Sequence, residues 1–92
     1  MKVEFSRLAR DDLFSIRDYI ADSNPRIADQ VALRILQSIR HLARFPELGS
    51  EWSNTGTRAL SIPGLPYRVH YRIAGQVVEI ITVVHTRRKL PF

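Results

Sequence analysis

The spacing of the apolar residues changes once along this chain of 92 residues. Up to residue 44 they recur every three or four positions, as on one face of an α-helix. From Thr57 onward they alternate with polar residues, as in a strand with one buried face. A sequence in which the helices precede most of the strands is typical of an α+β fold, with the helices on one face of an antiparallel sheet.

The helical part divides into two segments that the short connection Ser23-Asn24 joins into an antiparallel hairpin. Ser6 can cap the first helix, and Asn24 followed by Pro25 can begin the second. We expect the second helix to end near Arg44, because Pro46 disfavours helix at the residue before it. The apolar faces consist of Ala9, Leu13, Ile16 and Ile20 in the first helix and of Ala28, Val31, Ala32, Ile35, Ile39 and Leu42 in the second.

The strands are expected before and after the helices. The first is Lys2–Phe5, and the segment 47–56, rich in Gly, Ser and Asn, is expected to be a loop. Three strands then form an antiparallel meander: Thr57–Ile62, Tyr67–Ile73 and Val77–Val84. In the middle one, Tyr67, Val69, Tyr71 and Ile73 share the face expected to pack on the helices. The opposite face carries Arg68, His70 and Arg72, and we expect no helix to cover it.

The positive charge of the chain lies in its C-terminal part. The net charge is +5, yet lysine and arginine balance aspartate and glutamate up to Trp52. The excess comes from Arg58, Arg68, Arg72, Arg87, Arg88 and Lys89, against Glu79 alone. Concentrated positive charge attracts phosphates and acidic protein segments. A mixture of positive and negative charges along this part of the chain would serve solubility better than an excess of one sign.

Several classes of protein do not fit this composition. The absence of cysteine excludes disulfides, thiol nucleophiles and cysteine-based metal sites. No metal-ligand motif or phosphate-binding loop is visible, so we expect no metal and no cofactor. Neither a signal peptide nor an apolar run that could span a membrane is visible, which predicts a single cytoplasmic domain over residues 1–92.

The order of short motifs resembles the RelE/ParE superfamily of type II toxin–antitoxin toxins over essentially the whole length. The motifs that carry this resemblance are Ala9-Arg10-Asp11-Asp12-Leu13, Asn24-Pro25, Leu42-Ala43-Arg44-Phe45-Pro46-Glu47-Leu48-Gly49, Gly56-Thr57-Arg58, Tyr67-Arg68-Val69, Tyr71-Arg72-Ile73 and His85-Thr86-Arg87-Arg88. The Phe-Pro-x-x-Gly helix exit and the Val-x-His-x-x-Arg ending are similar to the ParE branch.

The resemblance implies a toxin that a cognate antitoxin with an acidic C-terminal segment neutralises in a hetero-oligomer. ParE-type members poison DNA gyrase by binding, RelE-type members cleave mRNA at the ribosome, and a third alternative is a decayed member that only binds its antitoxin. Candidate target-binding residues are Arg58, Arg68, Arg72, His85, Arg87 and Arg88. Candidate antitoxin-binding residues are Tyr19, Ile20, Ile27, Leu36 and Arg72.

Two histidines bear on the choice between binding and cleavage. A nuclease would need a base, an acid and a cation. The candidates are His85 or His70, Glu47 or Glu51, and Arg58, Arg68, Arg72 or Arg87, with His85 and Arg68 favoured. His85 could equally fix the C-terminal turn through a hydrogen bond. The lysine cluster of RelE-type toxins is missing from the central loop. His70 lies between two arginines that disfavour its charged form, so we expect it to make a neutral contact with a partner.

Overall fold

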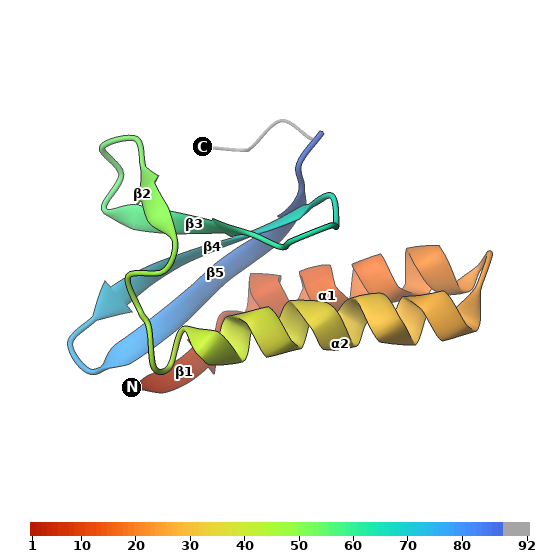
Figure 1. Ribbon diagram of the computed structural model, residues 1–92, viewed down its shortest axis with the longest axis horizontal. Coiled ribbons are helices and arrows are strands. Elements are labelled where there is room, and N and C mark those ends of the chain that lie inside the picture. Colours follow the sequence, from red (N-terminus) through yellow and green to blue (C-terminus); the bar gives the residue numbers. More distant parts are fainter. Residues whose placement is uncertain (88–92) are drawn as a thin grey trace.

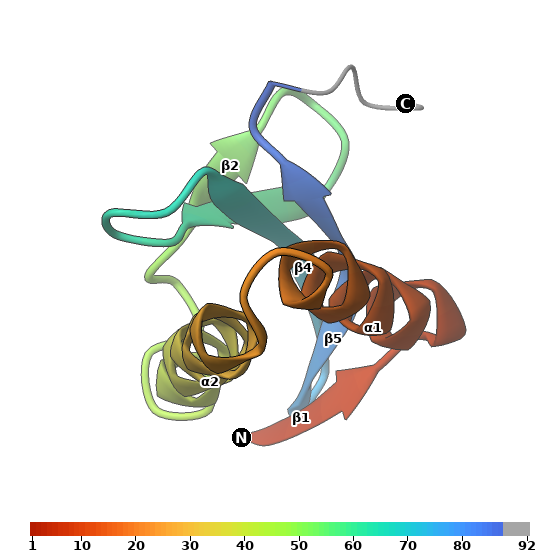
Figure 2. The ribbon, with the colours of Figure 1, turned by 90° about the vertical axis from the view of Figure 1, so that its right-hand side faces the viewer.

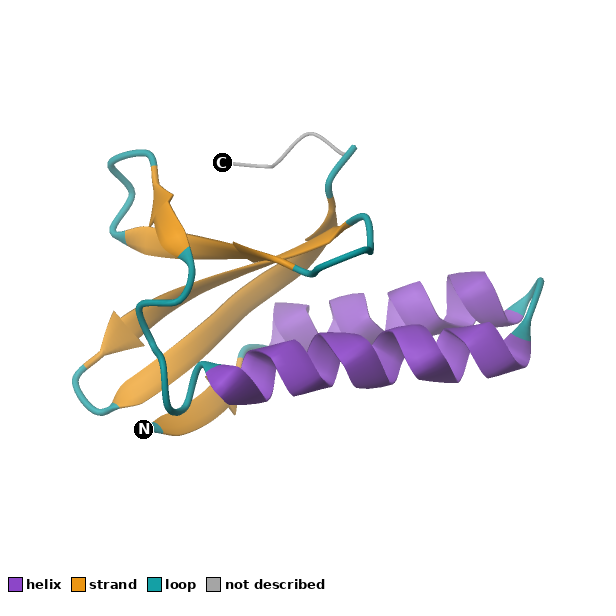
Figure 3. Cartoon of the chain, viewed as in Figure 1, coloured by secondary structure: helices purple, strands orange, loops and turns teal. Residues whose placement is uncertain are grey.

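The computed structural model describes residues 1–87 as two helices and a five-stranded sheet (Figure 1). The predicted α+β class is therefore confirmed. The elements are β1 (Lys2–Phe5), α1 (Arg7–Ala21), α2 (Pro25–His41), β2 (Ser50–Trp52), β3 (Thr57–Ser61), β4 (Tyr67–Ala74) and β5 (Val77–His85). Short loops join most of them (Figure 3). The last residues, 88–92, lie outside the described part of the chain.

Both helices begin where their caps predict. The Ser6 hydroxyl accepts a hydrogen bond from the Ala9 N–H, and the Asn24 side chain accepts one from the Ile27 N–H. Pro25 occupies the first position of α2, where its missing N–H costs no helical hydrogen bond. The hairpin places α1 and α2 side by side on one face of the sheet, as predicted (Figure 1).

The sheet has the strand order β1-β5-β4-β3-β2. Strands β2 to β5 pair antiparallel in sequence order, and β1 pairs parallel with β5 at the opposite end of the sheet. The expectation of a loop over residues 47–56 was wrong in its centre, because Ser50–Trp52 forms β2 and pairs with β3. The predicted three-stranded meander, β3 to β5, is thus the middle of a larger, mixed sheet that β1 and β2 complete at its two edges.

The core lies between the helix pair and the sheet. Ala9, Ile35, Ile39 and Leu42 are fully buried against Val69, Tyr71, Val78 and Ile80 from the central strands. The predicted apolar faces of α1 and α2 are therefore confirmed. Ile73 is an exception to the predicted alternation, since it lies at the end of β4 and is 38% exposed.

The loop between α2 and β2 is fixed to the core by the Tyr71 hydroxyl. This buried hydroxyl donates a hydrogen bond to the Pro46 carbonyl at 2.7 Å and accepts one from the Gly49 N–H at 2.8 Å. A Cβ atom at Gly49 would lie only 2.7 Å from the same hydroxyl oxygen, so no larger residue fits there without a shift. The Phe-Pro-x-x-Gly exit from α2 therefore sets where β2 begins.

Candidate functional site

The face of the sheet away from the helices carries a stacked group of three side chains, Trp52, Arg68 and His70. The Arg68 guanidinium lies 4.5 Å from the centre of the Trp52 ring, and its Nε–H donates a hydrogen bond of 2.9 Å to His70 Nε2. The Trp52 and His70 rings meet edge to face, with their centres 4.9 Å apart. Strands β2 and β4 supply these residues, and β3 lies between them.

The prediction that His70 contacts a partner was wrong. His70 lies on the predicted face, yet it is fully buried beneath Trp52 and Arg68. Burial, and secondarily the neighbouring Arg68 charge, lower the pKa of His70 from 6.5 to about 4. The predicted direction was correct, but loss of solvent is a larger cause than the arginine. His70 is therefore neutral near pH 7 and accepts a hydrogen bond from Arg68.

Two other candidate arginines contact groups of the chain itself. Arg72 pairs with Glu79 on the neighbouring strand, with 2.8 Å between Nε and the carboxylate oxygen. Arg58 is half-buried on β3, which lies between β2 and β4. Its guanidinium donates a hydrogen bond to the Gly49 carbonyl at 2.8 Å. Arg68 and Arg72 share the uncovered face, whereas Arg58 points to the Tyr71 side.

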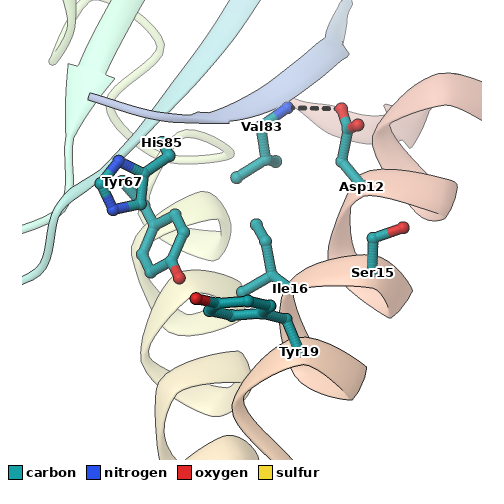
Figure 4. A pocket seen from close by; sticks show the side chains of 7 residues that line it. All are labelled: Asp12, Ser15, Ile16, Tyr19, Tyr67, Val83 and His85. Atoms are coloured by element: carbon teal, nitrogen blue, oxygen red, sulfur yellow. Dashed lines mark hydrogen bonds between the residues drawn. The ribbon is translucent and has the colours of Figure 1, made fainter. Parts of the chain in front are cut away.

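A cleft of about 300 Å³ lies where α1 passes the C-terminal end of β5 (Figure 4). Tyr19 from α1 and Tyr67 with His85 from the sheet line it, and Asp12 lies at its end. Tyr19 is 77% exposed, so the cleft is open to solvent on its side. The Tyr67 and His85 rings meet edge to face with their centres 5.4 Å apart.

His85 fixes the turn that follows β5. Its Nδ1 accepts a hydrogen bond from the Arg87 N–H at 3.2 Å, which confirms the predicted turn contact. Because Nδ1 accepts a hydrogen bond, the neutral ring carries its own proton on Nε2. A histidine in this state can donate a hydrogen bond to an anion, but it cannot remove a proton from a hydroxyl without first losing the turn contact. Arg87 is exposed, and Arg88 lies outside the described residues.

The candidate antitoxin-binding residues do not form one groove. Tyr19 lines the cleft beside His85, whereas Leu36 lines a hollow between α2 and β1. Ile20 packs partly against the core, Ile27 is 42% exposed in the first turn of α2, and Arg72 lies on the uncovered face of the sheet. A single short helix could not cover all five positions, because they lie on different sides of the molecule.

The hollow between α2 and β1 was not predicted from the sequence. It has a volume of about 300 Å³ and is lined mainly by Val3, Phe5, Leu33 and Leu36. Figure 2 shows β1 at the edge of the sheet beside the helix pair. Leu36 was among the predicted antitoxin-binding residues, but Leu33 was missed. Both fall outside the buried face of α2 and remain 39% and 55% exposed, respectively.

Two classes of site are not seen in the described part of the chain. Residues 1–87 contain no group of three or more histidine, aspartate and glutamate side chains placed to hold a metal ion. No helix over the same residues is long and apolar enough to cross a membrane.

Comparison with known proteins gives one family. The family model of the ParE toxin of the type II toxin–antitoxin system parDE matches residues 3–90. Toxin RelE2 of Caulobacter vibrioides is 35% identical to this chain over 84% of its length and 85% of the relative.

Similar solved structures include toxins from two bacteria. A chain of the chromosomal ParDE system from P. aeruginosa superposes with a TM-score of 0.84 at 22% identity, covering 95% of this chain and 97% of the other. A chain of the RelBE2 toxin–antitoxin complex from Mycobacterium tuberculosis gives 0.65 at 29% identity, with 91% and 95% covered. The first shows the fold, and the family match extends over nearly the whole sequence. The chain therefore belongs to the ParE toxin family of type II toxin–antitoxin systems.

Proposed function

We propose that this toxin acts by binding DNA gyrase together with its DNA, and that a cognate antitoxin neutralises it. The observation that carries the proposal is the state of the two sheet histidines. His70 is buried and neutral beneath Trp52, and His85 uses its Nδ1 lone pair to hold the turn at Arg87. Neither is arranged as the base that cleavage through a 2′-hydroxyl requires.

The positive surface supports action by contact. Arg68 is held in a fixed orientation on the uncovered face, and Arg87 is exposed just past the end of β5. Both lie in the C-terminal part that carries the excess charge. Such a surface attracts a negatively charged target and speeds its encounter with the toxin.

The antitoxin proposal rests on the apolar surface and on the solved relatives. The RelBE2 structure is a toxin–antitoxin complex. In this chain the hollow at Leu36 adjoins a second, cationic one lined by Arg40 and Arg44. An acidic segment with apolar side chains would cover both. Because Tyr19 lies on another side of the helix pair, we propose a segment that wraps around the toxin.

A second function is favoured by one specific observation, the 35% identity to toxin RelE2. The alternative is a ribosome-dependent mRNA endoribonuclease in which His85 and Arg68 act on the RNA. For this, the His85 ring would have to release the Arg87 N–H before it could accept a proton.

Two assays on the purified chain separate these functions. One follows DNA supercoiling by gyrase, together with the accumulation of cleaved DNA, and the other follows mRNA cleavage on programmed ribosomes. We expect inhibited supercoiling, accumulated cleaved DNA and intact mRNA. Cleaved mRNA with unaffected gyrase would establish the nuclease instead. Inactivity in both assays, with the antitoxin still bound, would indicate a decayed toxin.

A further inference from the structure

The Trp52–Arg68–His70 group has a geometry that a simple structural role does not require. The guanidinium lies over one aromatic ring and is bonded through Nε to another, so two different contacts determine its position. An arginine held through Nε keeps its two terminal nitrogens at the opposite edge of the plane. These are the groups that bind a phosphate or carboxylate in a bidentate manner.

We propose that Trp52 and His70 are positioning residues that hold the Arg68 guanidinium for contact with the phosphate groups of a nucleic acid. This inference rests on the proposed function and deepens it, since both candidate targets are nucleoprotein complexes. Arg68 is the binding group. Trp52 and His70 act through it.

The charge around Arg68 favours an external anion. No carboxylate among residues 1–87 lies within salt-bridge distance of it, whereas Arg72, on the same strand and face, is paired with Glu79. Its cross-strand neighbours are Ser61 on β3 and Val84 on β5, which carry no charge. Within residues 1–87, the positive charge of Arg68 is thus held in place without a carboxylate to neutralise it.

The neutral state of His70 is part of the arrangement. Only an uncharged imidazole has a lone pair to accept the Arg68 Nε–H. A lysine or a protonated histidine at position 70 would repel the guanidinium. Burial under Trp52 keeps the ring neutral, so the stacked indole serves both the histidine and the arginine.

A nucleic acid suits this site better than an acidic peptide. The half-buried Trp52 lies at the edge of the sheet on β2, where an aromatic side chain can also contact an unpaired base. An acidic peptide would use the guanidinium but gain little from the indole. We therefore expect a single-stranded oligonucleotide to bind more tightly than a glutamate peptide of equal charge.

The test measures binding of a labelled oligothymidylate to the full chain by fluorescence anisotropy. Emission of Trp52, the only tryptophan of the chain, reports on the site itself. We expect binding that weakens as salt rises, accompanied by a change in Trp52 emission. Arg68→Lys keeps the charge but loses the planar fork, and should weaken binding about tenfold. Arg26→Lys, on the exposed start of α2, is the matched control and should bind as the natural chain does.

Substitutions at position 70 distinguish positioning from packing. His70→Gln keeps an uncharged acceptor that can reach Arg68, so it should retain most of the affinity. His70→Leu fills similar space without an acceptor and should weaken binding about as much as Arg68→Lys. If His70→Leu does not fold, a comparison of Trp52→Leu with Trp52→Phe replaces it. We expect only the aromatic variant, Trp52→Phe, to keep its affinity for the oligonucleotide.

Three results would overturn the inference. The first is no binding of the oligonucleotide, or tighter binding of the glutamate peptide. The second is equal affinity in Arg68→Lys and the natural chain. The third is a His70→Leu protein that is less stable but binds equally well, which would make His70 purely structural.

The proposed function can fail separately. If the natural chain leaves gyrase active while the oligonucleotide series behaves as expected, the gyrase proposal is wrong and the phosphate site stands. If the natural chain inhibits gyrase and His70→Leu inhibits it equally, the proposed function stands and the positioning inference is wrong.

Discussion

At the scale of residues, single side chains fix the loops of this protein to its core. The Tyr71 hydroxyl joins Pro46 and Gly49 through one donated and one accepted hydrogen bond in a buried place. Burial raises the pKa of this hydroxyl above its usual value, so it remains a neutral donor and acceptor. The position of β2, and with it Trp52, depends on this residue.

Tyr71→Phe should lower the free energy of unfolding by about 1–3 kcal/mol, because the substitution leaves the buried Gly49 N–H and Pro46 carbonyl without their partner. Urea unfolding at pH 7 measures the change. Tyr19→Phe is the matched control, since that tyrosine is 77% exposed, and it should be within about 0.5 kcal/mol of the natural chain. Equal stability of the two variants would contradict the role of the Tyr71 hydroxyl.

The stability of the fold should depend on pH through His70. Its pKa in the folded chain, about 4, lies below the ordinary value of 6.5, so the unfolded chain binds the additional proton first. Stability is therefore fully present above pH 6.5 and is lost as the pH falls toward 4, by about 3 kcal/mol in all.

Urea unfolding at several pH values between 7 and 4 checks this expectation. His70→Gln should lose most of this pH dependence, whereas His41→Gln, at an exposed position, should keep it. An unchanged pH dependence in His70→Gln would show that other groups cause it.

At the scale of elements, helix α1 takes over from strand β1 as the neighbour of β5. The β1–β5 pairing ends at Phe5 and Ile80. Just beyond, Ile81 is a bulge that has no partner on β4, and its carbonyl accepts a hydrogen bond from the Ser6 hydroxyl at 2.6 Å. Asp12 then accepts hydrogen bonds from the Val83 N–H at 3.0 Å and from the Thr82 hydroxyl. These contacts fix one wall of the cleft at His85.

Asp12→Ala should therefore destabilise the chain by about 1–3 kcal/mol, because it removes the acceptor of two hydrogen bonds, one of them from the backbone of β5. Thermal unfolding followed by circular dichroism measures the effect. Asp11→Ala removes an exposed carboxylate one residue away and should change little. Asp12→Asn retains an acceptor and should fall between the two.

The elements that local sequence signals specify were predictable. Ser6 and Asn24 cap their helices where expected, and the apolar periods of α1, α2 and β4 identify the buried faces. Strand β2 was missed because its three residues stand among Ser, Asn and Gly, and only pairing with β3 makes them a strand. The parallel pairing of β1 with β5 likewise joins residues about 75 positions apart, which no local pattern specifies.

The candidate site could be predicted only in part for the same reason. Arg68 and His85 were identified from their places on strands, and the turn contact of His85 was one of two alternatives considered. The burial of His70 was missed because Trp52, from a segment expected to be a loop, covers it. Strand alternation predicts that positions facing away from the helices are open, but a curved sheet can cover its own residues.

At the scale of the molecule, the fold places its exposed apolar residues and the stacked Arg68 on different sides. The helix pair and β1 carry exposed apolar residues such as Leu33 and Leu36, while the opposite face of the sheet carries Arg68 and Arg72. Of the arginines predicted to meet the target, Arg72 pairs with Glu79 and Arg58 bonds the Gly49 carbonyl, whereas Arg68 has no carboxylate partner among residues 1–87 and Arg87 is exposed. We propose that the antitoxin uses the first side and the target the second.

The account depends on action by contact and not by turnover. The most direct test titrates the natural chain and His85→Ala into a supercoiling reaction at several gyrase concentrations. We predict that half-inhibition requires an amount of toxin proportional to the gyrase present. His85→Ala, which loses the turn contact and the ring contact with Tyr67, should shift this amount by no more than about threefold. A different result would contradict the account: gyrase stays active, and the natural chain cleaves mRNA on ribosomes when present at a small fraction of the ribosome concentration. In that case His85→Ala would leave the mRNA intact.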